Sequence, residues 1–309
     1  MLVLAGPTAV GKSALAIALA RRIGAEIVSC DSAQVYRGLD IGSAKVRPRE
    51  QQGVPHHLID VVDPDQRFTV ADYQAQALAA IESIHRRGRL PLLVGGTGLW
   101  LRAVVRDYAF PAEDQDAPLR RQIAEAAGQY GWEAIRRALR MVDPESYQKI
   151  SAGDRRRLAR ALEVWWNTGQ PMVRNAGPSP YRVSYWVVFR PVAELHRRIA
   201  QRTEAMLTEG LVEEVEDLLR RGVAPRAQSL SAIGYREAVD WCFGRLTLGE
   251  LERLIRRHSE QLAKRQMTWF RGEDDVHWLD LAAWGEERAL DTLVKAAQGL
   301  VGQSVRTPG

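Results

Sequence analysis

Residues 6–13, GPTAVGKS, have the residue types of a phosphate-binding loop. They match G-x-x-x-x-G-K-[ST] at every fixed position and stand between a short apolar run and a helical pattern, the setting that this motif requires. In such a loop the backbone amides face an anion, the lysine adds positive charge, and the serine hydroxyl can bind Mg²⁺. The predicted phosphate-binding residues are Gly6, Pro7, Thr8, Ala9, Val10, Gly11, Lys12 and Ser13, of which Ser13 is also the predicted metal ligand. The motif does not say which molecule carries the phosphates.

Three more polar residues have types that suit chemistry at a phosphate. Asp31 suits a general base or a metal-binding carboxylate, and equally the cap of a turn. Thr97, in the GGTG of residues 95–98, either offers a hydroxyl to a ligand or belongs to a plain strand-to-helix turn. Arg202 either neutralises charge beside the phosphate loop or lies on the surface. Their spacing alone leaves these alternatives open.

The elements that carry these residues predict an α/β fold with a parallel sheet. Apolar segments at residues 2–5, 25–30, 90–94 and 184–189 have the pattern of buried strands, and helical patterns cover residues 13–23, 70–87 and 192–208. Open parallel sheets bind ligands at the carboxyl ends of their strands. Since Lys12, Asp31 and Thr97 all follow such ends, we expect them to converge on one cleft.

The middle of the chain has a different texture. Residues 110–185 contain helix-like segments rich in Arg, Ala and Trp, opened by PAEDQDAP and closed by QPMVRNAGPSPYR. We therefore predict a helical insertion domain at 110–185, within a core formed by residues 1–109 and 186–309.

The composition is that of a globular protein outside the membrane. The chain has 309 residues, 46% of them hydrophobic and 26% charged, without an apolar run long enough to span a bilayer or to form a leader, so a cytoplasmic location is expected. Its two cysteines, Cys30 and Cys242, have neither disulfide-framework nor zinc spacing and are expected to be buried. His56 and His57 are adjacent, which favours structural roles over a metal site.

The charge pattern suits a polyanionic partner. The net charge is +5, with arginines in clusters, and on charge alone a nucleic acid and a solvated helix surface are equally good explanations. Cations mix with aromatic side chains in residues 231–236 (SAIGYR) and 264–271 (KRQMTWFR), and residues 155–160 form an arginine run. Cations hold a nucleic-acid backbone and rings stack on unpaired bases, so these segments together favour RNA.

Taken in order, GPTAVGKS, DSAQVYRGLDIGSAK, HHLID, LLVGGTGLWLRA, RRLARALEV, SAIGYRE and LAKRQMTWFRG resemble the tRNA dimethylallyltransferases over nearly the whole chain. The resemblance implies a P-loop NTPase-like core with a mobile, tRNA-binding helical insertion. It also implies transfer of a dimethylallyl group from dimethylallyl diphosphate to N6 of the adenosine 3′ of the anticodon, in tRNAs reading U-starting codons. Diphosphate is released with the help of Mg²⁺, and ATP is not consumed.

The resemblance also implies roles for individual residues. Asp31 would be the general base, with Thr97 and Arg202 beside it in the catalytic set. The implied tRNA contacts are Asp31, Ser32, Ala33, Gln34, Thr97, Arg120, Arg156, Arg157, Leu158, Ala159, Arg160, Ser231, Ala232, Ile233, Gly234, Tyr235, Arg236, Lys264, Arg265, Gln266, Met267, Thr268, Trp269, Phe270 and Arg271. The sequence departs from the family pattern at Trp100, where a tyrosine is usual, and in RRLAR, where QRLSR is commoner.

Two alternatives remain open on the sequence. An ATP-dependent small-molecule or nucleotide kinase would explain the phosphate loop but would leave the basic, aromatic segments without a purpose. A non-catalytic RNA-binding NTPase would need a water-positioning carboxylate that only Asp31 could supply. A single tRNA site requires no more than a monomer.

Overall fold

The computed structural model describes residues 1–108, 117–172 and 179–301. The chain divides into two compact units, one formed by Met1–Val105 with Ser179–Gly309 and one by Arg106–Pro178. The expected insertion boundary at 110 lies outside the described residues. The boundary at 185 differs from the structure, because Ser184 and Tyr185 pair with Leu2 and Val3 in the sheet and so belong to the first unit.

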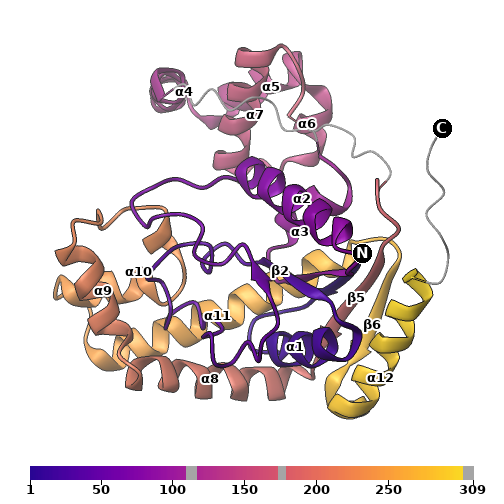
Figure 1. Cartoon of the computed structure of the whole chain (residues 1–309). Helices are drawn as coiled ribbons and strands as arrows, with labels where there is room; N and C mark the ends of the chain where they lie inside the picture. Colours follow the sequence, from indigo (N-terminus) through magenta and orange to yellow (C-terminus); the bar gives the residue numbers. More distant parts are fainter. Residues whose placement is uncertain (109–116, 173–178, 302–309) are drawn as a thin grey trace. The chain divides into compact units, whose positions relative to one another are not determined.

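The first unit is built on a six-stranded, wholly parallel sheet with the strand order β3-β2-β4-β1-β5-β6 (Figure 1). The strands are β1 Leu2–Ala5, β2 Glu26–Cys30, β3 His56–His57, β4 Pro91–Gly95, β5 Ser184–Phe189 and β6 Val276–Asp280. The four predicted strands are confirmed to within one residue at each end, and β3 and β6 were not predicted. The α/β fold with a parallel sheet is confirmed.

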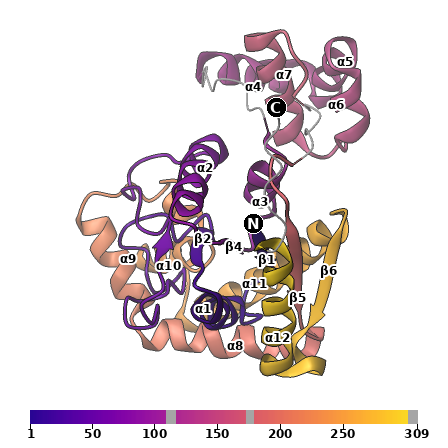
Figure 2. The same cartoon turned by 45° about the vertical axis from the view of Figure 1, so that its right-hand side comes forward.

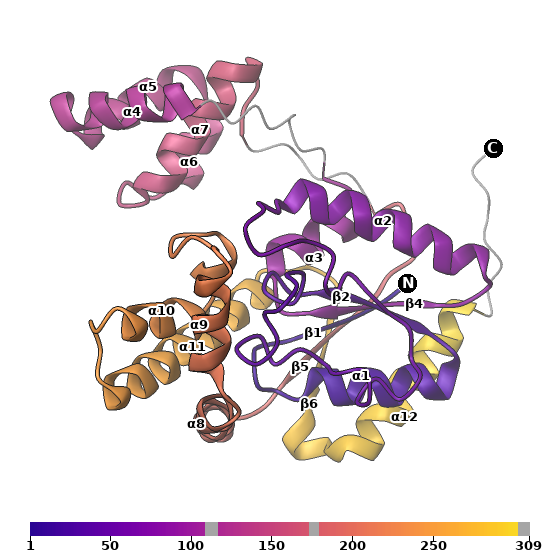
Figure 3. The same ribbon diagram turned by 60° about the vertical axis from the view of Figure 1, so that its left-hand side comes forward.

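Helices cover both faces of this sheet (Figure 3). On one face α1 (Lys12–Ile23) and α12 (Leu281–Val301) pack on a core that includes Leu2 and Leu4. On the other face α2 (Val70–Arg86) and α3 (Gly98–Val105) pack on a core that includes Val3. Alternate residues of the central strand thus enter opposite cores, as the pleat requires.

The remaining helices of the first unit form a group beside α1 and the sheet (Figure 3). They are α8 Val192–Thr208, α9 Leu211–Arg220, the 3₁₀ turn η1 Ser229–Ser231, α10 Tyr235–Cys242 and α11 Leu248–Arg271. The long helix α11 packs against both α8 and α10. It starts at a capping box in which Thr247 and Glu250 satisfy each other's backbone amides, and buries Ile255, Ala263 and Phe270 along one stripe.

The second unit is helical, as predicted for the insertion (Figure 2). It contains α4 Ala117–Tyr130, α5 Trp132–Val142, α6 Pro144–Lys149 and α7 Arg155–Thr168 around a core of its own. Asp143 organises this unit, because one carboxylate oxygen caps α6 at the Ser146 amide and the other accepts the Met172 amide. Within the three described ranges, no helix is both long and apolar enough to cross a membrane.

The cysteine expectations hold with one exception. Cys30 is free and buried as expected, whereas Cys242 is free but only partly buried. His57 lies 2.7 Å from the buried Glu26 carboxylate, which also pairs with Arg87. Over the described part of the chain, no group of three or more His, Cys, Asp or Glu side chains could hold a metal ion.

Candidate active-site cleft

The phosphate loop joins β1 to α1 and is shaped by glycine. Gly6 has φ +152°, and a Cβ there would lie 2.3 Å from the Val188 carbonyl oxygen of β5, so the loop closes on the sheet only with glycine. Gly11 caps α1 in the left-handed region and provides no side-chain acceptor. The first amides of α1 are therefore left for another acceptor, which is the property of an anion site.

Lys12 lies inside this loop. Its Nζ donates a hydrogen bond of 2.6 Å to the Pro7 carbonyl. Removal from water lowers the pKa of Lys12 to about 8, and Arg202 acts in the same direction while Asp31 opposes it. Keeping Lys12 charged inside the loop therefore costs free energy, and a bound anion would reduce that cost.

Asp31 caps a turn and also lines the cleft with the phosphate loop. Its Oδ1 accepts the backbone amides of Ala33 at 2.9 Å and Gln34 at 3.4 Å, which makes it the cap of a turn. The charge of the same carboxylate acts on both Lys12 and Arg202 and partly offsets the lowering of their pKa values by burial. Asp31 therefore faces the phosphate loop with a fixed orientation.

Thr97 holds the loop after β4 to the loop after β2. Its Oγ1 accepts the Ser32 amide at 3.3 Å, and its own amide donates to the Cys30 carbonyl at 3.4 Å. The ends of β1, β2 and β4 therefore meet as the strand pattern predicts, with Lys12, Asp31 and Thr97 all lining the same cleft.

Arg202 crosses from α8 to the phosphate loop. Its guanidinium donates to Thr8 Oγ1 at 3.2 Å and to the Ser43 carbonyl at 3.3 Å, and burial lowers its pKa. Arg198, one turn earlier on α8, donates to the Ala9 carbonyl at 2.7 Å. Arg198 was not predicted, although its i, i+4 spacing from Arg202 is the signal that could have found it.

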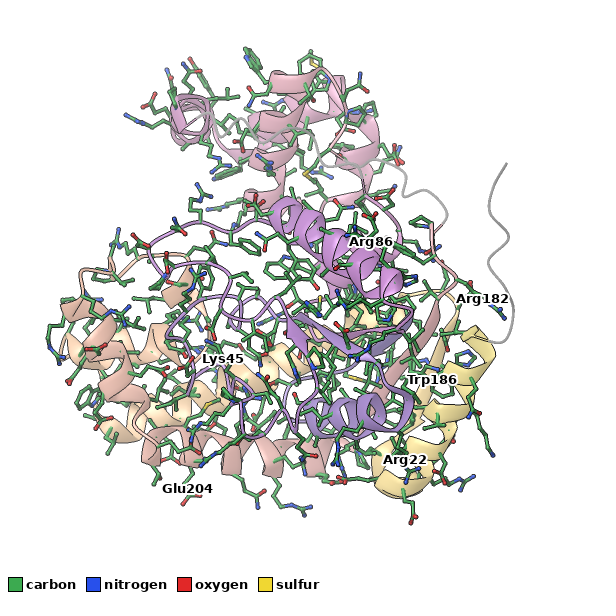
Figure 4. All side chains as sticks on the ribbon, viewed as in Figure 1. Arg22, Lys45, Arg86, Arg182, Trp186 and Glu204 are labelled. Carbon is green, nitrogen blue, oxygen red and sulfur yellow. The ribbon has the colours of Figure 1, made fainter. Side chains whose placement is uncertain are left out.

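The loop that supplies Ser43 is fixed by a buried lysine. Lys45, labelled in Figure 4, places its ammonium 2.6 Å from the carboxylates of both Asp40 and Asp60 and donates to the Tyr36 carbonyl. A cation that is 5% exposed and so fully bonded keeps residues 40–45 in one conformation. The Ser43 carbonyl is thereby held in place for Arg202.

Helix α11 closes the cleft above the phosphate loop. Gln266 Oε1 accepts the Thr8 amide at 2.9 Å, and Gln266 Nε2 donates to the Gly96 carbonyl at 2.9 Å. One turn on, the Trp269 ring lies on Gly98, where a Cβ would come within 2.4 Å of the ring. Gly98 is thus required because a helix packs directly on the backbone of this turn.

A second polar group lines the same cleft. The buried Glu237 carboxylate accepts Arg236 Nη2 at 2.6 Å and contacts His258 Nδ1 at 2.7 Å, and its second oxygen accepts the Gly234 amide at 2.7 Å. Arg236 and His258 both line the cleft. His258 and Glu237 were not predicted, since 21 residues separate them and no motif links them.

These groups surround a single cleft of about 1660 Å³ in the first unit. The predicted residues that line it are Thr8, Ala9, Gly11, Lys12, Ser13, Asp31, Ser32, Ala33, Gln34, Thr97, Arg202, Ser231, Ala232, Ile233, Arg236, Arg265, Gln266 and Trp269. The predicted residues of the first unit outside the lining are Gly6, Pro7, Val10, Gly234, Tyr235, Lys264, Met267, Thr268, Phe270 and Arg271.

Two rings expected to stack on bases belong to the core instead. Tyr235 is fully buried, and its hydroxyl donates to Glu214 at 2.6 Å. Phe270 is also fully buried, on the inner stripe of α11. Neither ring is available to a nucleotide, because the helical period turns both toward the hydrophobic core. Trp100 is likewise in the core, stacked on Tyr73 with ring centroids 4.3 Å apart.

The remaining predicted contacts lie in the second unit. Arg120 of α4 and Arg160 of α7 both pair with the buried Glu163, at 2.8 Å and 3.1 Å. Leu158 was expected to contact tRNA. Its side chain is fully buried in the core of this unit and is therefore not available for that contact. Arg156 and Arg157 are exposed at the start of α7. Within residues 155–160, Leu158 thus lies in the core, Arg160 forms an ion pair, and Arg156 and Arg157 are on the surface.

Known proteins resemble this chain over most of its length. Residues 34–273 match the sequence model of the family described as IPP transferase. The tRNA dimethylallyltransferase of Moorella thermoacetica is 47% identical over 286 residues, covering 89% of this chain and 88% of the relative. That of Symbiobacterium thermophilum is 46% identical over 300 residues, covering 96% and 94%. The crystal structure of the full-length tRNA isopentenylpyrophosphate transferase from Bacillus halodurans superposes with a TM-score of 0.74 at 38% identity, covering 97% of this chain and 96% of that one.

Proposed function

The chain belongs to the IPP transferase family, and on that premise we propose that its cleft transfers a dimethylallyl group from dimethylallyl diphosphate to a tRNA adenosine. It is an enzyme of tRNA modification, a prenyltransferase. The acceptor atom is N6 of the adenosine 3′ of the anticodon, in tRNAs that read U-starting codons. The observation that carries this proposal is that the phosphate loop, Asp31 and the basic helix α11 line one cleft.

In this reaction the adenine N6 attacks C1 of the prenyl group, and the C1–O bond breaks with its electron pair leaving on diphosphate. The N6 proton passes to a base, for which Asp31 is the candidate because its carboxylate is fixed by two amides. Lys12, Arg202 and the amides of the phosphate loop stabilise the negative charge that develops on the leaving oxygens. Thr97, bonded to the Ser32 amide, fixes the segment that follows Asp31.

The residues present suit Mg²⁺ together with a diphosphate. Ser13 is exposed at the start of α1, and Asp31 supplies a carboxylate on the same cleft. Mg²⁺ takes few protein ligands and keeps waters or phosphate oxygens for the rest. Bound there, it would neutralise charge on the leaving diphosphate.

The basic residues of the cleft suit RNA. Arg236, His258 and Arg265 line it, and the buried Glu237 holds the first two in place. A flipped adenine is least costly to extrude from a loop that is already single-stranded. The second unit, which carries the exposed Arg156 and Arg157, is proposed to be mobile and to bind tRNA. The protein acts as a monomer in the cytoplasm, with its tRNA substrate.

The reaction is tested by supplying two labelled donors separately. The protein, Mg²⁺ and a tRNA with consecutive adenosines in its anticodon loop are incubated with radiolabelled dimethylallyl diphosphate or with γ-labelled ATP. Label passing from the prenyl donor into the tRNA supports the proposal. Turnover of ATP alone would support the kinase alternative and would remove the roles given to Asp31 and Thr97.

The affinity for dimethylallyl diphosphate is expected to fall as pH rises above about 8. The pKa of Lys12 is lowered to about 8, so its charge is present below this pH and is lost above it. A bound diphosphate favours the charged form, and affinity therefore falls by up to about tenfold per pH unit above the pKa. The measurement is the dissociation constant between pH 7 and 9.5. Lys12→Arg is the control, because an arginine stays charged and the pH dependence should flatten; an equally steep curve would exclude Lys12 as its source.

The exposed cations near the end of α11 are expected to contribute to tRNA affinity through phosphate contacts. Lys264→Ala or Arg271→Ala should weaken tRNA binding and reduce the slope of log K against log salt by about 0.7 to 0.9, the value for one phosphate contact. The slope is measured by titrating a labelled anticodon stem-loop at several salt concentrations. Lys295→Ala removes an exposed lysine from α12 and serves as the matched control. An unchanged slope in both α11 variants would assign that segment a structural role.

A further inference from the structure

Gln266 is the one residue of α11 whose side chain is bonded to two of the loops at the strand ends, among the hydrogen bonds recorded for the described residues. Its Oε1 accepts the Thr8 amide in the phosphate loop, and its Nε2 donates to the Gly96 carbonyl in the GGTG turn, both at 2.9 Å. The amide orientation is fixed by these partners, because a backbone N–H needs an acceptor and a carbonyl needs a donor. The glutamine thus spans the ends of β1 and β4.

The packing around Gln266 leaves it little freedom. A Cβ at Gly96 would lie 2.3 Å from Gln266 Nε2, so the turn and the side chain are in direct contact. Trp269 lies on Gly98 one turn further along α11, and the Arg102 guanidinium stacks 4.4 Å from the centre of its ring. Gln266 and Trp269 therefore seat one face of α11 on the turn that carries Thr97. A movement of α11 would therefore also move this turn.

Thr8 connects the same helix to the groups around the diphosphate. While its amide is held by Gln266, its hydroxyl accepts Arg202 at 3.2 Å. Arg202 in turn interacts electrostatically with Asp31, whose charge partly offsets the lowering of the Arg202 pKa by burial. Arg265, the preceding residue of α11, lines the cleft in which RNA is proposed to bind. Gln266 therefore connects the helix that carries Arg265 to the phosphate loop and to the GGTG turn.

We propose that Gln266 is a positioning residue that couples tRNA binding to diphosphate binding. This inference rests on the proposed function and adds a role that differs from direct tRNA contact. When RNA fixes α11, Gln266 holds the Thr8 amide and the Gly96 carbonyl in the arrangement that binds the diphosphate. By linkage, diphosphate then tightens RNA binding by the same factor.

The experiment measures this coupling with inorganic pyrophosphate and Mg²⁺ as the probe. The dissociation constant of pyrophosphate is determined with and without a saturating anticodon stem-loop, and the ratio of the two is the coupling factor. We expect a ratio of about ten or more for the unchanged protein, within the usual range for coupled sites, and below about two for Gln266→Met. The methionine keeps the length and packing of the side chain but forms neither hydrogen bond.

Two further variants make the result specific. Gln266→Asn keeps an amide that is too short to reach both loops, so it should also lose the coupling although the polar group is retained. Gln76→Met replaces an exposed glutamine of α2 and should keep the full ratio. Circular dichroism on each variant verifies that the helices are retained.

The outcomes separate this inference from the proposed function. A coupling ratio near one in the unchanged protein, or a full ratio in both Gln266 variants, would overturn the role of Gln266. Transfer of labelled prenyl groups to tRNA is followed in the same samples of unchanged protein. If that transfer occurs and the coupling does not depend on Gln266, only the present inference fails; if no transfer occurs, the proposed function fails first.

Discussion

Replacing Asp31 by asparagine is expected to lower the turnover number for prenyl transfer by a factor on the order of 10² to 10⁴, the usual contribution of a general base. Asparagine keeps an oxygen that can accept the amides of Ala33 and Gln34, so the turn survives. It cannot take the proton that leaves the adenine N6. The loss should therefore fall on the chemical step, with tRNA affinity within about twofold of the original value.

Single-turnover kinetics with preformed enzyme–tRNA complex measure this effect without the binding steps. Asp63→Asn is the matched control, because Asp63 is an exposed aspartate in the loop after β3, outside the cleft lining, and its recorded ion pair among the described residues is with the exposed Arg37. Its rate should be unchanged. Loss of tRNA binding in Asp31→Asn, with a normal rate per bound complex, would show that Asp31 serves the RNA and not the proton transfer.

The core of the fold was predictable because its signals are local. The strand, glycine loop and helix of residues 2–23 follow one another in sequence, and burial on both faces makes β1 and β4 continuous apolar runs. The two strands that were not predicted lack such a signal. β3 has only two residues, and β6 contains the exposed His277 and Trp278 at the edge of the sheet. Their pairing depends on partners distant in sequence.

The site was predictable only in part, for a related reason. Lys12, Asp31 and Thr97 follow strand ends, and the parallel topology brings such ends together. Gln266 reaches Thr8 across 258 residues of sequence, and no pattern in the chain indicates that contact. The resemblance to a family identifies whole segments. Within a helical segment, the helical period decides which residues face the cleft, the core or the solvent. In residues 264–271 it places Gln266 on the phosphate loop and the GGTG turn, Phe270 in the core and Lys264 in solvent.

Replacing Arg202 by alanine is expected to lower kcat/KM for dimethylallyl diphosphate by a factor on the order of 10² to 10³, as removal of one preorganised donor to a developing negative charge does. Arg202 is held by Thr8 Oγ1 and the Ser43 carbonyl, so its charge is in place before the diphosphate arrives. Arg202→Lys should recover only part of the loss, since a lysine cannot reproduce the two directed contacts of a guanidinium.

The measurement is steady-state kinetics with the prenyl donor varied at saturating tRNA, together with the tRNA dissociation constant. Arg197→Ala removes an exposed arginine from the same helix and should leave both quantities unchanged. The decisive comparison is between the two substrates. If Arg202 acts on the leaving diphosphate, its loss changes the constants for the donor and spares those for tRNA. If its loss instead changes the constants for tRNA and spares those for the donor, Arg202 acts in RNA binding. Equal losses in Arg197→Ala and Arg202→Ala would mean that Arg202 contributes only through the general positive charge of α8.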